Sequence, residues 1–127
     1  MSSEKKVRMI DLRNDVEYQS LLDGRPETSG LRAGRVYLQA GESCGQHNTE
    51  RNEEVLVFLS GRGLAVIGNN CCYEVGEGKV SYIPPDTVHD IKNTGNQPLI
   101  YVYCVAPVHH KQSAHESKKP RPNSVER

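Results

Sequence analysis

The fold of this chain is indicated most strongly by GESCGQHNTERNEEVLVFLSG, residues 41–61, and by GKVSYIPPDTVHDIKN, residues 78–93. Each segment begins with a glycine and carries one histidine, His47 in the first and His89 in the second. A carboxylate, Glu54, follows the first histidine and opens an apolar run. Two imidazoles and one carboxylate suit a borderline divalent ion, so the two segments predict a metal pocket.

Short apolar runs separated by glycine, proline and asparagine surround these two segments. We expect strands over residues 36–38, 55–59, 64–67, 71–75, 80–83, 88–91 and 99–105, with a tight turn at Asn69-Asn70. No helical periodicity lies between the runs. Many short strands at this spacing predict an all-β sandwich or barrel, and 127 residues suffice for a single domain with one core.

The two ends of the chain differ in texture from this central part. Residues 1–29 form a lead-in, in which residues 7–10 could add a strand and residues 16–22 a poor helical turn or two. The barrel is predicted over residues 30–107. Residues 108–127 are polar and carry more basic than acidic side chains, so we expect a disordered tail.

Charge and hydropathy exclude several classes of partner. The 16 basic and 16 acidic side chains balance, so no overall field favours nucleic acid or an anionic membrane. No apolar run approaches the roughly 20 residues that a membrane helix needs. The start of the chain shows no signal-peptide core, so a cytoplasmic location is the default expectation.

The four cysteines include no CxxC pair, so a zinc knuckle is not predicted. In a cytosolic chain we expect reduced thiols. Cys71 and Cys72 are adjacent and would point to opposite faces of a strand, which disfavours a mutual disulfide. Cys44 lies three residues before His47, so it is either a buried small apolar side chain or a pocket residue.

The two histidine segments resemble the two motifs of the cupins, which are small barrels of the jelly-roll class. The first cupin motif, G-x5-H-x-H-x(3,4)-E-x6-G, is matched by Gly41, His47, Thr49, Glu54 and Gly61. The second, G-x5-P-x-G-x2-H-x3-N, is matched by Gly78, Pro84, Asp86, His89 and Asn93. The resemblance implies a single-domain cupin jelly-roll β-barrel with a short N-terminal extension. It also implies a divalent ion (Fe, Mn, Zn or Ni) held by His47, Glu54 and His89.

Two positions depart from the cupin pattern. Asp86 stands where the second motif has a turn glycine, which is a mild change because aspartate also tolerates turns. Thr49 stands where the first motif has its second histidine, so only three of the four usual ligands are present. Either water completes the coordination shell, or Thr49 only lines the pocket, or the metal is lost. Further candidates for the pocket wall are Cys44, Phe58, Tyr101 and Tyr103.

The resemblance implies several functions and does not decide between them. Cupins include dioxygenases and sugar or keto-acid isomerases, and the end of the first motif is similar to small cupins described as related to mannose-6-phosphate isomerase. The alternative is a non-catalytic cupin that binds or senses a small ligand with a weak or lost metal site. The expected partners are a small molecule and a second copy of the chain in a homodimer. Whether the protein is an enzyme stays open here.

Overall fold

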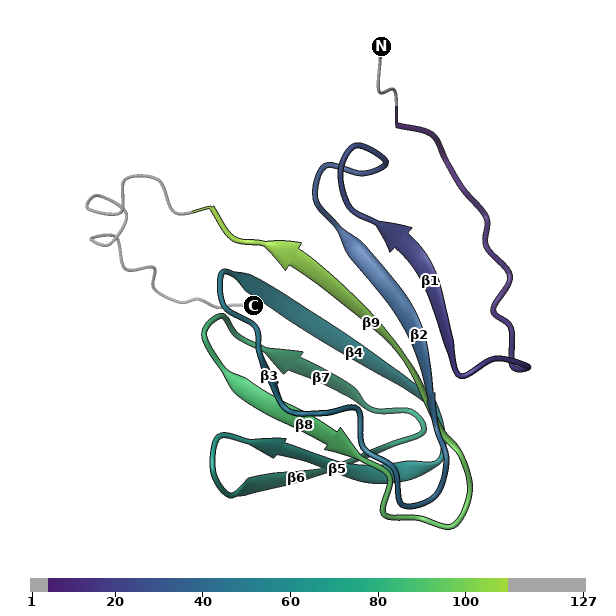
Figure 1. Cartoon of the computed structure of the whole chain (residues 1–127), viewed down its shortest axis with the longest axis vertical. Coiled ribbons are helices and arrows are strands. Elements are labelled where there is room, and N and C mark those ends of the chain that lie inside the picture. Colours follow the sequence, from purple (N-terminus) through teal and green to yellow (C-terminus); the bar gives the residue numbers. More distant parts are fainter. Residues whose placement is uncertain (1–4, 110–127) are drawn as a thin grey trace.

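The computed structural model of the chain describes residues 5–109, and its strands form two sheets that face each other (Figure 1). One sheet has the strand order β1-β2-β9-β4-β7 and the other β3-β8-β5-β6. The strands are β1 Tyr18–Asp23, β2 Arg32–Leu38, β3 His47–Asn48, β4 Asn52–Ser60, β5 Arg62–Ile67, β6 Cys71–Gly76, β7 Val80–Ile83, β8 Val88–Lys92 and β9 Leu99–Pro107. No helix occurs in this range, which confirms the predicted all-β class.

The core lies between the inner faces of the two sheets. Along β4, Leu56 and Phe58 point inward and are almost fully buried, whereas Val57 and Leu59 point outward. This is the two-residue period of a strand with one face on a core. The buried cluster consists of Leu38, Leu56, Phe58, Ala65, Val75, Ile83, Ile91, Leu99 and Tyr101. Each large side chain in it contributes about 1.5–3 kcal/mol by leaving water.

The outer face of the five-stranded sheet keeps apolar side chains in contact with solvent. Val57 and Leu59 on β4 are 37% and 41% exposed, and Val80 and Tyr82 on neighbouring β7 are 65% and 58% exposed. The homodimer expected from the sequence stays a prediction.

Two turns show why the motifs have glycine, or a residue that can replace it, at particular positions. Gly61, between β4 and β5, has a φ of +86°, and a Cβ added there would lie 2.2 Å from the carbonyl oxygen of Pro98. Asp86, between β7 and β8, has a φ of +54°, so aspartate does take the left-handed conformation expected of the glycine that it replaces. The β5–β6 turn does contain Asn69-Asn70, but the positive φ there belongs to Gly68.

The lead-in differs from what the sequence predicted. Residues 7–10 form no strand, and Val7 and Met9 are 87% and 88% exposed. The expected helical turn over residues 16–22 is also wrong, because β1 runs through most of that segment and pairs antiparallel with β2. The edge of β2 presents unpaired backbone groups, and pairing satisfies them where a short isolated helix would not.

The predicted tail, residues 108–127, lies almost entirely outside the described residues, and the division of the chain at residues 29 and 107 stays a prediction. Across residues 5–109, no helix has the length and apolar character needed to cross a bilayer.

Candidate metal centre

The two histidines of the predicted pocket lie opposite each other in one sheet. β3 pairs with β8 so that His47 faces His89, and their ring centroids are 4.2 Å apart in an edge-on arrangement. In each histidine Nδ1 lies next to the carbonyl oxygen two residues earlier, at 3.0 Å from Gly45 and 3.1 Å from Thr87. A carbonyl can only accept a hydrogen bond, so each Nδ1 carries a proton. In the neutral rings both Nε2 atoms therefore keep the lone pair that binds metal.

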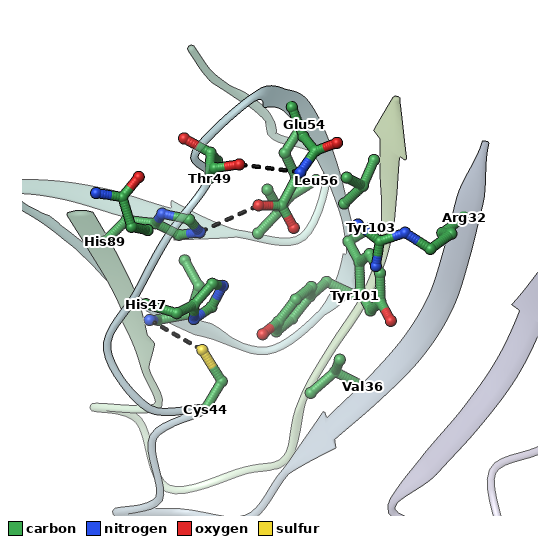
Figure 2. A pocket seen from close by; sticks show the side chains of 14 residues that line it. Arg32, Val36, Cys44, His47, Thr49, Glu54, Leu56, His89, Tyr101 and Tyr103 are labelled. Carbon is green, nitrogen blue, oxygen red and sulfur yellow. Dashed lines mark hydrogen bonds and ion pairs between the residues drawn. The ribbon is translucent and has the colours of Figure 1, made fainter. Parts of the chain in front are cut away.

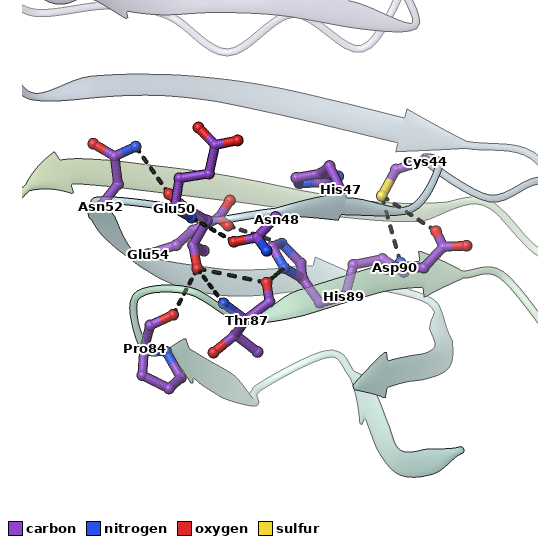
Figure 3. Close-up of polar contacts among 12 residues, drawn as sticks. Cys44, His47, Asn48, Glu50, Asn52, Glu54, Pro84, Thr87, His89 and Asp90 are labelled. Atoms are coloured by element: carbon purple, nitrogen blue, oxygen red, sulfur yellow. Dashed lines mark hydrogen bonds and ion pairs between the residues drawn. The ribbon is translucent and has the colours of Figure 1, made fainter. Parts of the chain in front are cut away.

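The carboxylate comes from the opposite sheet. Glu54 is the third residue of β4 and is 7% exposed, with its side chain on the inner face. Its neighbour Glu53 points outward, as strand alternation requires, and accepts a hydrogen bond of 2.8 Å from the hydroxyl of Tyr82. The jelly-roll topology thus brings two residues of one sheet and one of the other to the same point (Figure 3).

The geometry of the three side chains fits a metal ion. Their ligand atoms lie within 4.8 Å of one another, close to the span of two metal–ligand bonds of about 2.0–2.2 Å. Nε2 of His89 is 3.1 Å from Oε1 of Glu54, yet it is fully buried and has no well-directed hydrogen bond. The two atoms are close together but are not aligned for a hydrogen bond, which is the arrangement of two ligands that bind the same ion. These residues could therefore hold a divalent metal.

The environment of His89 couples metal binding to pH. Burial favours the neutral ring, but the nearby Glu54 carboxylate and the carbonyl of Thr87 raise its pKa above the usual value. A proton therefore competes with metal for Nε2. Metal affinity is accordingly lost as the pH falls through this raised pKa.

Thr49, the residue in place of a usual histidine, is bonded into the loops beneath the site. Its hydroxyl donates to the carbonyl of Pro84 at 2.7 Å and accepts from the N–H of Thr87 at 3.0 Å. The carbonyl of Thr87 in turn accepts from the N–H of Thr49 and from Nδ1 of His89, both at 3.1 Å. Thr49 thus holds the loop whose carbonyl orients a histidine, and it also lines the pocket.

A cavity of about 270 Å³ opens beside the three side chains (Figure 2). Three of the four wall residues suggested by the sequence besides Thr49 do line it, namely Cys44, Tyr101 and Tyr103. Phe58 does not. It is 2% exposed and packs against Tyr101 at a ring-centroid distance of 5.1 Å, because it lies two strand repeats beyond Glu54, deeper in the core.

Sequence reasoning missed half of the cavity wall. The additional residues are Arg32, Val36, Asn48, Asn52, Leu56, Ile91 and Val105. The sequence could have indicated Arg32, because it lies an even number of residues from Val36 and Leu38 and therefore faces the same side of the strand. The expected strand began at residue 36, after the glycine at 34, and so left Arg32 out.

Cys44 is exposed as a residue, but its thiol is turned inward. The sulfur accepts a hydrogen bond from the N–H of Ile91 at 3.4 Å and lies 3.6 Å from a carboxylate oxygen of Asp90. Burial raises the pKa of the thiol, and the nearby charge of Asp90 acts in the same direction. In the absence of a metal ion the thiol of Cys44 is therefore neutral, and it lines the cavity.

Alkylation should distinguish Cys44 from the exposed Cys71 and Cys72, which lie on β6. We expect iodoacetamide at neutral pH to modify the two β6 cysteines first and Cys44 at least about tenfold more slowly, because the reagent needs an accessible thiolate. Peptide mass spectrometry over a time course measures the three rates, with the unfolded protein in urea as the reference. Equal rates in the folded protein would contradict the enclosed thiol.

The profile of the family described as "Cupin domain" matches residues 34–105, more than half of the chain. The chain is a cupin. The match spans both histidine segments and Glu54, so the resemblance read from the two motifs is confirmed at the level of the family and its conserved barrel.

Individual relatives agree with this family assignment. An uncharacterized protein of Methanocaldococcus jannaschii is 43% identical over 61 residues, which is 48% of each chain, so this cupin matches about half the length of that relative. A crystal structure from Bacillus halodurans is 30% identical with a TM-score of 0.67, covering 77% of this chain and 75% of that one. An RmlC-like cupin family protein with a double-stranded β-helix fold, also from M. jannaschii, is 17% identical with a TM-score of 0.64, covering 80% and 91%. The last likeness bears on the fold alone.

Proposed function

We propose that this cupin binds a divalent metal ion through His47, Glu54 and His89 and presents it to a small organic molecule in the adjoining cavity. The observation that carries the proposal is the convergence of three ligand atoms within 4.8 Å, two of them on side chains that are buried. Isolated buried charges and lone pairs are costly, and a shared ion would satisfy all three at once. The metal class (Fe, Mn, Zn or Ni) follows from the mixed imidazole and carboxylate donors.

Two imidazoles and one carboxylate leave coordination positions open, a pattern typical of non-haem Fe(II) oxygenases and equally suited to a Lewis acid that polarises a carbonyl group. The finer proposals are therefore a dioxygenase or a sugar or keto-acid isomerase. The tyrosines around the site are suited to binding a ligand rather than to removing a proton from it. Burial raises the pKa of Tyr101 and of Tyr103 well above the ordinary value, so both phenols stay protonated and can form hydrogen bonds with a ligand but cannot act as bases.

A second candidate function is a non-catalytic barrel that binds or senses a small ligand. The observation in its favour is Thr49, whose hydroxyl already makes two hydrogen bonds within the protein and is a weak donor to metal in any case. With three protein ligands the affinity for metal is lower than with four. A weakly held ion would suit reversible binding better than turnover.

Metal analysis of the purified protein tests the proposal. We expect untagged protein to retain an equimolar amount of one divalent metal after gel filtration, measured by inductively coupled plasma mass spectrometry, and to regain it after removal with a chelator. Oxygen uptake with the Fe(II)-loaded protein and a panel of small acids and sugars then separates a dioxygenase from a binding protein. A chain that takes up no metal from a micromolar solution would contradict the proposed centre.

A further inference from the structure

We infer that the molecule taken by this cavity is a small carboxylic acid whose carboxylate is held by Arg32, at the opposite side of the cavity from the metal centre. The inference rests on the proposed metal site, which would bind the other polar group of the ligand. It assigns Arg32 as an anion-binding residue, and the sequence motifs say nothing about this position.

Strand register fixes the position of Arg32 relative to the candidate ligands. Arg32 on β2 and Glu54 on β4 both pair with Val105 of β9, one from each side. The three residues therefore form a row across adjacent strands, and the outer two lie about 10 Å apart at the backbone because strands are spaced by about 4.8 Å. All three side chains line the cavity. Figure 2 shows the Arg32 side chain reaching from β2 towards Tyr103, on the side of the cavity away from His89.

The guanidinium of Arg32 is free to bind a ligand. Within residues 5–109 it makes no ion pair, since the ion pairs there join Arg8 to Glu27, Arg13 to Asp15 and His89 to Glu54. Its charge acts on the hydroxyl of Tyr103, whose pKa burial raises and Arg32 lowers. That hydroxyl is already hydrogen-bonded to Tyr18. The fork of donors on the guanidinium is thus left for an anion with matching geometry, and a carboxylate is such an anion.

The charge balance of the cavity also favours an anionic ligand. Arg32 and Glu54 are the only ionised side chains in its described wall when both histidines are neutral, and they cancel. A divalent ion on Glu54 and the histidines would make the cavity strongly positive. A neutral sugar would leave this charge uncompensated, whereas an acid would place a negative group beside Arg32 and a second oxygen beside the metal centre.

The size and lining of the cavity limit the acid. Its volume of about 270 Å³ is below the roughly 300–1,000 Å³ of sites for drug-sized ligands. The cavity wall includes several apolar side chains, among them Val105, which lies between Arg32 and Glu54 in the row across the strands. A short aliphatic chain with a carboxylate at one end and a keto or hydroxyl oxygen at the other fits this description. We therefore assign the class of small oxo and hydroxy acids whose second oxygen lies several bonds away from the carboxylate, such as 4-oxopentanoate and 4-hydroxybutanoate.

Calorimetric titration of the whole chain tests the assignment. The protein is loaded with Mn²⁺, which avoids the exposed cysteines because thiolates prefer softer ions. It is titrated with 4-hydroxybutanoate, with 4-hydroxybutanamide as the uncharged match and ethyl phosphate as the other small anion. We expect the acid to bind at least about tenfold more tightly than the amide, which cannot form charge-assisted hydrogen bonds with Arg32. We expect a similar preference over ethyl phosphate, which lacks the second oxygen that would reach the metal centre.

Variants of Arg32 complete the experiment. Arg32→Gln should weaken the acid at least about tenfold while leaving the Mn²⁺ content unchanged, and Arg32→Lys should recover part of the affinity because it keeps the charge without the fork. The matched control is Arg62→Gln on β5, which changes an arginine outside this cavity and should have no effect. Circular dichroism checks that all variants are folded.

The outcomes separate this inference from the proposed function. If the wild-type protein holds Mn²⁺ but binds the amide as well as the acid, or if Arg32→Gln binds the acid normally, Arg32 is not the anion site. If the phosphate binds as well as the acid, the assignment to a carboxylic acid is wrong. If the protein holds no metal, the metal centre is wrong, and the same titrations on the metal-free chain decide about Arg32. Acid binding that depends on Arg32 supports its role there, and its absence overturns it.

Discussion

Replacing His89 by alanine should leave a folded barrel that no longer retains a divalent metal ion. His89 is 1% exposed and supplies one of the three candidate ligand atoms that meet within residues 5–109. Loss of a mere outer-shell partner costs about 10–100-fold in metal affinity, so loss of a ligand should cost more than about 100-fold. Metal content after gel filtration and titration with Mn²⁺ measure the effect.

The chain offers a matched control for this variant. His109 is an exposed histidine that does not line the cavity, so His109→Ala should keep the wild-type metal content. Removing a buried ring leaves a void and an unpaired Glu54, so His89→Ala should also melt at a lower temperature. Glu54→Gln, which keeps the size of the side chain, checks the centre with less disturbance. Equimolar metal in folded His89→Ala would refute the ligand assignment.

Replacing Gly61 by alanine should abolish most of the stability of the fold. The residue has a φ of +86°, where a side chain costs about 1–2 kcal/mol. The new Cβ would also lie 2.2 Å from the carbonyl oxygen of Pro98 and 2.8 Å from Cα of Leu99, and both are backbone atoms that cannot rotate away. Small domains have only about 5–15 kcal/mol in total, so we expect largely unfolded or insoluble protein, measured by urea denaturation.

Gly78 separates the two causes of this expected loss. Its φ of +84° is nearly the same, but a Cβ added there meets nothing within 4 Å. Gly78→Ala should therefore lose only about 1–2 kcal/mol, the conformational part. The difference between the two variants reports the collision with the β9 backbone. Equal denaturation midpoints for Gly61→Ala and Gly78→Ala would show that the strands can move apart at no cost.

The parts of the fold that the sequence predicted are those with local signals. The strand expected over residues 80–83 is observed with the same bounds, since a glycine at position 78 and a pair of prolines at 84–85 flank it. The motif spacing predicted His47, Glu54 and His89 as candidate ligands, and the structure brings their ligand atoms within 4.8 Å of one another. These features depend on residues that are neighbours along the chain.

The parts that were missed depend on contacts between distant segments. β1 has no strong alternation of its own and forms because the edge of β2 needs a partner and because Tyr18 stacks on Tyr103. Arg32 enters the cavity wall only because β2 extends past Gly34 to pair with β9. The role of Thr49 could not be predicted either, since its hydrogen-bonding partners lie about 35 residues further along the chain.

Each imidazole is hydrogen-bonded through Nδ1 to the carbonyl group of the residue two positions earlier, and this affects how an ion would bind. Both rings are fixed in tautomer and direction by their own segments, before any ligand arrives. Little side-chain freedom then remains to be lost on loading, and the backbone has no reason to rearrange. Uptake should accordingly proceed at the pace at which the hydrated cation sheds its water, with apo and holo forms sharing one shape.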